Sequence, residues 1–312
     1  MNSETATTNQ CYLVGSFTTE SRSSAHADLR ELERLCRAAG LAPVGGELVH
    51  VRDPQPALYL GTGQADRIIT AAHDREAGII VFDREMSPVH LRNWARRSKL
   101  EVYDRHAVIL EIFSSRARTR EAQLQVELAR AEYAQSHLAG MWQHLSRQGG
   151  GSRLARGEGE KQIEIDRRRL SRRVQRARKA LDQVSRQRQL RRRGRDGMYR
   201  VALVGYTNAG KSSLMNRLTT GGIRTANQLF ATLDPTTRKL YLDQDTTALV
   251  SDTVGFVRHL PPELIEAFHS TLEEVTEADL LLIVVDTSDP RVTAHFHEQI
   301  CGTLELDNTE IV

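Results

Sequence analysis

Short apolar runs alternate with helical patterns over the first third of the chain. Four of these apolar runs predict strands at 11–14, 47–51, 78–82 and 108–112. Between them, apolar residues recur at helical spacing near 25–39, 64–75 and 88–98. This alternation predicts an α/β domain with a largely parallel sheet, which we place at residues 11–115. The polar residues 1–10 predict a disordered tail.

The hydrophobic spacing changes at about Arg116. Mostly apolar positions then follow at intervals of four and three, as in a coiled-coil seam: Leu124, Leu128, Ala131, Gln135, Leu138, Trp142 and Leu145. A second seam comprises Ile163, Leu170, Val174, Ala177, Leu181 and Val184. We therefore predict an antiparallel helical hairpin over residues 116–196. Its tip would be the glycine-rich loop 149–159, with Arg153 and Arg156 in it.

A third pattern occupies residues 197–312, which we assign to a separate domain. The run 199–204 has the pattern of a buried strand, and a helical pattern begins at Ser212. Residues 205–212 between them match G-x-x-x-x-G-K-S, the pattern of a phosphate-binding loop. The predicted fold class is therefore α/β throughout, with a helical hairpin between an N-terminal domain and a P-loop domain.

Each part of this loop has a chemical role toward a nucleoside triphosphate. Lys211 is expected to reach the β- and γ-phosphate oxygens, and Ser212 to offer its hydroxyl to Mg²⁺. Backbone N–H groups of the loop and the helix N-terminus would surround the phosphates. The predicted contacts are Gly205, Tyr206, Thr207, Asn208, Ala209, Gly210, Lys211, Ser212 and Ser213.

A second motif, D-x-x-G, follows the predicted strand 247–251 and comprises Asp252, Thr253, Val254 and Gly255. Asp252 stands 41 residues after Lys211, at a strand end, where a carboxylate can hold Mg²⁺ through a water molecule. The N–H of Gly255 can meet the γ-phosphate. We therefore expect all four residues to contribute to the nucleotide site.

The threonine-rich segment 230–238 between the two motifs predicts a switch loop. One threonine hydroxyl there should reach Mg²⁺ when the γ-phosphate is present; we assign this role to Thr232, with Thr236 and Thr237 as alternatives. Phe230 is expected to lie beside the nucleotide. The predicted catalytic residues are Lys211, Thr232 and Gly255, and the predicted metal ligands are Ser212, Thr232 and Asp252.

The residue after Gly255 is Phe256, where many GTPases have a glutamine that orients the attacking water. A phenyl ring cannot hydrogen-bond this water. Hydrolysis is therefore expected to be slow unless a partner, a cation or another residue completes the site. The side-chain oxygen of Asn208 could hold a monovalent cation beside the phosphates.

The net charge of +3 conceals a strong asymmetry along the chain. Residues 153–195 have 17 Arg or Lys against 5 Asp or Glu, whereas residues 197–312 have 8 against 16. An arginine-rich helical segment favours a phosphate-backbone partner such as RNA. Three scattered cysteines exclude a disulfide framework, and the sequence predicts neither a membrane span nor a signal peptide. We expect a cytoplasmic monomer.

Several segments resemble the HflX family of ribosome-binding GTPases: Tyr59–Gly63, Phe82–Pro88, Arg116–Leu128, Gly140–Trp142, His144–Gly151, Gly159–Gln162 and Phe230–Arg238. The resemblance implies a Mg²⁺-dependent GTPase that docks on the large ribosomal subunit and its rRNA. The arm 116–196 would approach the peptidyl-transferase region, and stalled ribosomes would dissociate under stress. It also implies stimulation by K⁺ through Asn208.

The guanine-reading N-K-x-D motif of such GTPases is absent from the sequence up to Val312. We therefore expect a C-terminally truncated chain that keeps its phosphate and Mg²⁺ contacts. Two alternatives stay open from the residues alone. The chain could be an rRNA-binding module without turnover, or a P-loop ATPase.

Overall fold

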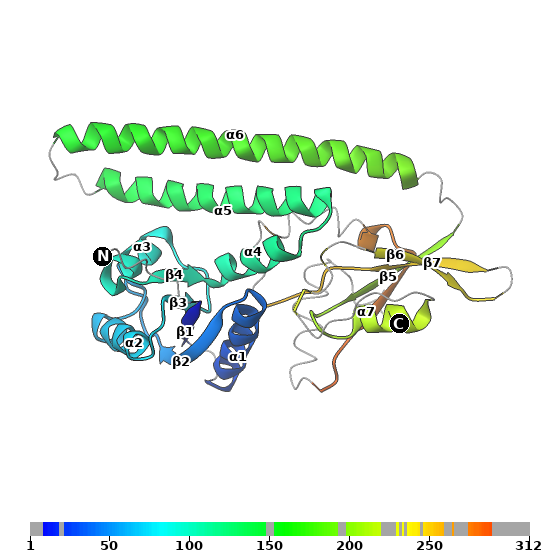
Figure 1. Cartoon of the computed structure of the whole chain (residues 1–312), viewed down its shortest axis with the longest axis horizontal. Coiled ribbons are helices and arrows are strands. Elements are labelled where there is room, and N and C mark those ends of the chain that lie inside the picture. Colours follow the sequence, from blue (N-terminus) through cyan, green and yellow to red (C-terminus); the bar gives the residue numbers. More distant parts are fainter. Residues whose placement is uncertain are drawn as a thin grey trace, which may run out of the picture. The chain divides into compact units, whose positions relative to one another are not determined.

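A computed structural model of the chain describes residues 9–18, 22–147, 153–192, 198–219, 229–230, 233, 236–243, 246–258, 264 and 274–288 (Figure 1). The chain divides into two compact units, Met1–Ile112 with Arg130–Val174, and Phe113–Ala129 with Gln175–Val312. Each unit has a four-stranded sheet of its own. The domain boundaries at residues 115 and 196 stay a prediction.

The sheet of the first unit is entirely parallel. Its strands are β1 (Gln10–Phe17), β2 (Ala42–His50), β3 (Ile79–Phe82) and β4 (Glu101–Asp104), in the order β2-β1-β3-β4. The helices α1 (Arg22–Ala38), α2 (Thr62–Asp74) and α3 (Pro88–Ser98) connect consecutive strands. The prediction of an α/β domain is confirmed, as are three of its four strands and all three of its helices.

The predicted fourth strand, 108–112, was wrong. These residues lie in helix α4 (Arg105–Arg116), and the fourth strand is β4, immediately before it. The run Val108-Ile109-Leu110 is fully buried together with Ile112 and Phe113. A helix buried on more than one side shows a continuous apolar run, which periodicity alone cannot distinguish from a buried strand.

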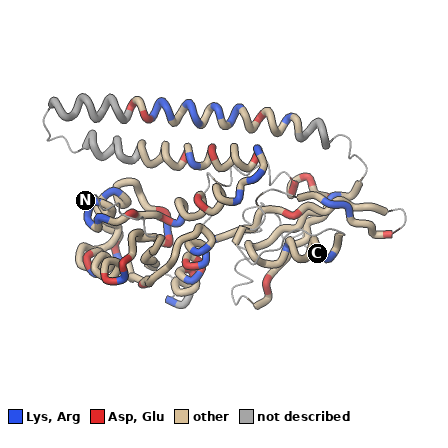
Figure 2. Tube along the Cα trace, in the orientation of Figure 1, with Lys and Arg blue, Asp and Glu red and all other residues tan. Residues whose placement is uncertain are grey.

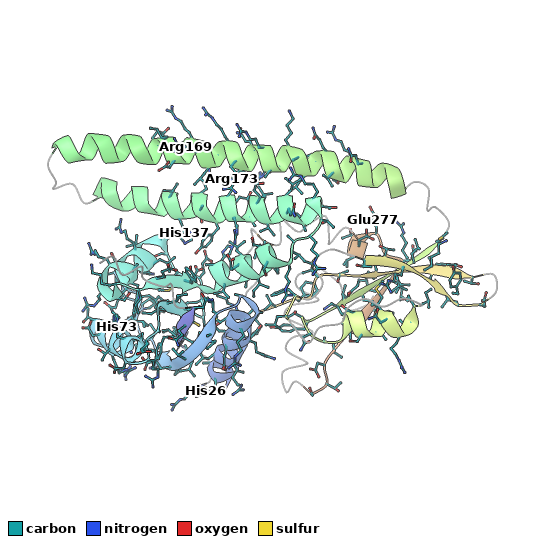
Figure 3. All side chains as sticks on the ribbon, in the orientation of Figure 1. His26, His73, His137, Arg169, Arg173 and Glu277 are labelled. Carbon is teal, nitrogen blue, oxygen red and sulfur yellow. The ribbon has the colours of Figure 1, made fainter. Side chains whose placement is uncertain are left out.

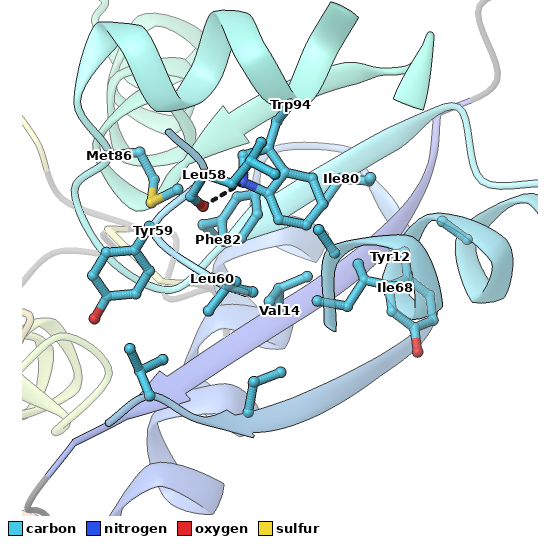
Figure 4. Close-up of a cluster of buried hydrophobic side chains, with 14 of the residues drawn as sticks. Tyr12, Val14, Leu58, Tyr59, Leu60, Ile68, Ile80, Phe82, Met86 and Trp94 are labelled. Atoms are coloured by element: carbon cyan, nitrogen blue, oxygen red, sulfur yellow. Dashed lines mark hydrogen bonds between the residues drawn. The ribbon is translucent and has the colours of Figure 1, made fainter. Parts of the chain in front are cut away.

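The core of the first unit is centred on Trp94 of α3 (Figure 4). Its ring meets that of Phe82 edge-on at a centroid distance of 4.9 Å. The indole N–H donates to the carbonyl oxygen of Leu58 at 2.8 Å. The hydrogen bond satisfies the one polar atom of a fully buried ring. The two contacts hold α3 against strand β3 and against the segment that precedes α2.

Two long helices, α5 (Arg120–Arg147) and α6 (Arg153–Arg192), correspond to the predicted seams (Figure 1). Ala177 is buried, and the other second-seam residues from Leu170 to Val184 are half-buried between exposed arginines. The side-chain amide of Gln135 donates to Ser171 Oγ at 3.2 Å, which joins α5 to α6. The predicted tip loop 149–159 was too long, because α6 already begins at Arg153 and includes Arg156. The side chains of Trp142, Leu145 and Ile163 lie outside the described residues.

The sheet of the second unit has the order β6-β7-β5-β8. Its strands are β5 (Tyr199–Gly205), β6 (Thr236–Tyr241), β7 (Thr247–Asp252) and β8 (Leu280–Val284), and α7 (Lys211–Leu218) follows β5. Strands β7, β5 and β8 are parallel, whereas β6 is antiparallel to β7. The carboxyl ends of the parallel strands β5 and β7 therefore meet at one edge, where doubly wound sheets bind ligands. Among the described residues, no helix is long and apolar enough to cross a membrane.

Candidate nucleotide-binding site

The loop between β5 and α7 contains three residues with positive φ. The angles are +152° at Gly205, +66° at Asn208 and +100° at Gly210. A Cβ atom at Gly205 would lie 2.2 Å from the carbonyl oxygen of Val284, so only glycine fits where β5 passes β8. Gly210 is the N-cap of α7, whose first N–H groups have no partner within the helix and are suited to an anion.

Lys211 is buried at the centre of this loop. Its Nζ donates to the carbonyl oxygens of Gly205 at 3.0 Å and Tyr206 at 2.9 Å. Burial lowers the pKa of Lys211 to about 8, although the nearby Asp252 carboxylate opposes this shift. The side chain is thus held over the loop, with an ammonium group that an added phosphate would stabilise.

Two of the three residues expected to hold Mg²⁺, Ser212 and Asp252, lie in contact. Ser212 Oγ lies 2.5 Å from Oδ2 of Asp252, which is fully buried at the end of β7. A hydroxyl and a carboxylate are hard oxygen donors of the kind that Mg²⁺ prefers. The two motifs, 40 residues apart in sequence, therefore converge on one point that fits this ion.

The second motif packs directly against the phosphate-binding loop. A Cβ atom at Gly255 would lie 2.6 Å from Thr207 Cα and 2.9 Å from Lys211 Nζ, so this approach needs glycine. The hydroxyl of Thr253 donates to the carbonyl oxygen of Leu203 at 2.7 Å. The backbone N–H of Gly255 is thereby confined to the neighbourhood of Lys211, as a γ-phosphate contact requires.

Phe256 points into the core. It is 6% exposed and packs with Ala202, Val204 and Val275. The ring carries no hydrogen-bonding group and does not replace the water-orienting glutamine, and slow unassisted hydrolysis stays a prediction.

The predicted switch threonines are placed only in part. Thr232 lies outside the described residues. Thr237 is in β6, where its hydroxyl meets Ser251 Oγ at 2.9 Å, and Thr236 pairs with Asp252 in the β6–β7 register. Of the two alternatives, Thr236 is the one that lies opposite a proposed metal ligand.

The remaining predicted contacts lie around the same loop. Asn208 and Ser213 are exposed, Ala209 and Val254 are half-buried, and Phe230 is buried beside Thr207. Phe230 N–H donates to Thr207 Oγ1 at 2.8 Å.

Sequence reasoning missed the bonds between the phosphate-binding loop and its neighbours. The hydroxyl of Tyr206 accepts from the Arg258 N–H at 2.9 Å, and Arg258 belongs to no motif. The variable positions of G-x-x-x-x-G-K-S are unconstrained by phosphate binding, so the pattern gave no signal for these contacts.

A second candidate site is the basic surface of α6. Its exposed basic side chains are Arg167, Arg168, Arg169, Arg172, Arg173, Arg176, Arg178, Lys179 and Arg186. In Figure 2 blue Lys and Arg positions recur along α6, separated by tan and a few red positions, and Figure 3 shows Arg169 and Arg173 as sticks. Only Glu164, Asp166 and Asp182 are acidic among the described side chains of α6. Such a series suits a polyanion.

Three protein-family profiles match successive parts of the chain. Residues 26–114 match the family described as GTP-binding GTPase N-terminal, and residues 116–195 match the GTP-binding GTPase Middle Region. Residues 200–311 match the family described as 50S ribosome-binding GTPase.

Curated relatives match most of the chain. It is 46% identical over 288 residues to GTPase HflX of Spirochaeta thermophila, covering 92% of this chain and 70% of the relative. Against GTPase HflX of Escherichia coli the identity is 42% over 286 residues, covering 91% and 67%. For the Magnetococcus marinus protein of the same name it is 45% over 279 residues, covering 89% and 64%. The chain thus spans about two thirds of the length of these relatives.

One solved structure has the same overall arrangement of elements. A crystal structure of SsGBP in complex with GDP matches with a TM-score of 0.52 at 23% identity, covering 95% of this chain and 78% of that one. At this identity the likeness concerns the fold alone.

Proposed function

Because this chain belongs to the HflX family of GTPases, we propose that it binds GTP in the loop 205–212 and hydrolyses it to GDP and phosphate. The observation that carries the proposal is the convergence of Lys211, Ser212 and Asp252 at the carboxyl ends of β5 and β7. A buried ammonium group, a hydroxyl and a carboxylate at one point are the groups that a triphosphate and its metal ion need.

The proposed roles follow from these positions. Lys211 binds the β- and γ-phosphate oxygens, while Gly255 N–H meets the γ-phosphate. Ser212 and Asp252 would hold Mg²⁺, together with Thr232. Mg²⁺ bound there neutralises negative charge on the β- and γ-phosphates. The backbone N–H groups of the loop and of the first turn of α7 bind the remaining phosphate oxygens.

Hydrolysis by the chain alone is expected to be slow, because buried Phe256 cannot orient water. We propose that Asn208, exposed at the rim of the loop, binds K⁺ beside the phosphates and adds positive charge in the transition state. The comparison of turnover in K⁺ and in Na⁺ tests this role. The same rate in both salts would eliminate it.

We propose that the partner is the large ribosomal subunit, bound by the cytoplasmic, monomeric protein through the rRNA-facing arm 116–196. The exposed arginines of α6 support this proposal because they supply a phosphate-binding surface without base selectivity. Dissociation of stalled ribosomes under stress would be the outcome of the GTP-bound encounter.

Sedimentation with purified large subunits tests the arm. R169Q/R173Q should weaken binding about tenfold and lower the slope of log affinity against log salt by about two. R30Q/R34Q is the matched control, since Arg30 and Arg34 are exposed at the same spacing on α1. Equal losses in both double variants would show that any basic helix suffices and would remove the assignment to α6.

Two other functions make distinct predictions. An rRNA-binding module would bind subunits equally with GTP, with GDP and without nucleotide, and would release no phosphate. If the chain were a P-loop ATPase, ATP would displace bound labelled GTP as effectively as unlabelled GTP does at the same concentration. We expect subunit binding that depends on GTP, together with release of phosphate from GTP.

A further inference from the structure

The residue type at position 207 is left variable by the pattern G-x-x-x-x-G-K-S, yet Thr207 forms two hydrogen bonds that leave the loop. Its backbone N–H donates to the carbonyl oxygen of Phe256 at 2.7 Å. Its Oγ1 accepts from the backbone N–H of Phe230 at 2.8 Å. The residue is 6% exposed. One buried threonine therefore contacts both the predicted switch loop and the D-x-x-G segment.

The hydrogen bond from Phe230 to Thr207 holds a segment of strained backbone. Phe230 has a φ of +53°, a left-handed conformation that a bulky residue adopts only when its surroundings impose it. Among the described residues of the second unit, Phe230 makes two contacts that would hold it there. They are the bond to Thr207 and an edge-on contact between the Phe230 and Phe113 rings, with centroids 4.7 Å apart. Phe230 stands two residues before Thr232, the predicted Mg²⁺ ligand.

The bond to Phe256 holds the second motif in the same way. Phe256 N–H donates back to the carbonyl oxygen of Gly205 at 3.1 Å, so the two backbones are joined in both directions. Gly255, one residue earlier, packs on Thr207 Cα. A shift of Thr207 must therefore displace Gly255, the predicted γ-phosphate contact.

We propose that Thr207 is a positioning residue that couples the two switch segments, so that the γ-phosphate contacts on both sides form together. The coupling rests on the proposed function, because it acts on the GTP-bound state. Ground-state binding of GDP does not require it, since GDP lacks the γ-phosphate and is bound by the loop itself.

The variant Thr207→Val keeps the shape and removes the acceptor of the Phe230 N–H. We expect kcat to fall about tenfold, with the affinity for GDP changed less than about threefold. Thr207→Ser restores the hydroxyl and should return kcat to near the wild-type value. The matched control is Thr219→Val. Thr219 is equally buried, and its hydroxyl donates to the Met215 carbonyl oxygen at the C-terminal end of α7.

Hydrogen exchange of the 312-residue chain gives a readout that does not depend on turnover. In nucleotide-free protein, the amide of Phe230 should exchange at least about tenfold faster in T207V than in the wild type or in T219V. A non-hydrolysable GTP analogue should protect the peptides containing Phe230 and Gly255 together in the wild type. In T207V it should protect only the second.

Unchanged exchange at Phe230 in T207V, or equal effects of T207V and T219V, would overturn the proposal. If no guanine nucleotide binds, the proposed function fails, yet the exchange of the nucleotide-free protein still decides whether Thr207 holds Phe230. A loss of kcat that Thr207→Ser does not recover would also contradict it.

Discussion

Ser212 Oγ lies 2.5 Å from Oδ2 of Asp252, although the two residues come from different motifs and different elements. A hydroxyl at the start of α7 and a carboxylate at the end of β7 meet only because β5 and β7 are parallel neighbours. The order of strands in the sheet therefore brings two expected Mg²⁺ ligands together at its edge.

The pair predicts a metal-dependent loss in Ser212→Ala. The affinity for GTP in Mg²⁺ should fall about tenfold or more, whereas the affinity in EDTA should stay unchanged. Fluorescent-nucleotide titration in both buffers measures this. Arg217→Gln is the control, because Arg217 is exposed on the same helix and belongs to neither motif. Equal losses in Mg²⁺ and EDTA would mean that the serine supports the loop and not the ion.

Removal of the buried cation should abolish nucleotide binding, so we expect no measurable GTP affinity for Lys211→Ala. In the wild type, affinity should also depend on pH. The lowered pKa of about 8 means that the ammonium form of Lys211 is present below pH 8 and is lost above it. Between pH 7 and pH 8.5, GDP affinity should therefore fall about fourfold. An affinity that stays flat or rises over this interval would contradict the placement of Lys211.

The first unit should lose stability in acid through His106. His106 is 2% exposed against the ring of Tyr133, and burial lowers its pKa to about 4, a shift that Asp104 opposes and His137 reinforces. A depressed histidine pKa stabilises the fold above pH 6.5, and this contribution is lost as the pH falls toward 4. From pH 7 to pH 5 the loss should be about 2 kcal/mol.

Urea unfolding of wild type and His106→Phe at several pH values isolates this contribution. Burial raises the pKa of Asp83 to about 7, which gives the opposite pH dependence in both proteins. The stability of the wild type minus that of His106→Phe should therefore fall by about 2 kcal/mol from pH 7 to pH 5. Substitution of the exposed His26 by Gln should leave the curve unchanged. A constant difference for His106→Phe would refute the assignment.

Trp94 tests the hydrophobic core of the first unit. Trp94→Ala should lower the free energy of unfolding of the first unit by about 3–5 kcal/mol, because it leaves a cavity against Phe82. Trp94→Phe should lower it by about 1–3 kcal/mol, because the Leu58 carbonyl loses its donor. Circular dichroism during thermal unfolding measures both. Wild-type stability in Trp94→Phe would show that the hydrogen bond contributes nothing, and equal losses in the two variants would show that the cavity adds nothing.

The sequence predicted the parallel sheet, the two long helices and the strand–loop–helix around Lys211, because these depend on local periodicity and on a motif. It misassigned Val108–Ile112, since Val108, Ile109, Leu110 and Ile112 are all buried in α4 and a nearly continuous apolar run does not reveal a helical period. The convergence of Ser212 and Asp252 followed from strand adjacency. The bond from Phe230 to Thr207 could not be predicted, because it depends on a left-handed backbone that no residue pattern encodes.

The most direct test of the account is steady-state phosphate release from GTP by the full chain, with and without purified large ribosomal subunits. We expect slow release alone and an increase of about tenfold or more with subunits, since a partner must complete a site that has Phe256 in place of glutamine. Lys211→Ala should release no phosphate, either with or without subunits. Equal rates with and without subunits, or release that persists in Lys211→Ala, would contradict a ribosome-completed GTPase.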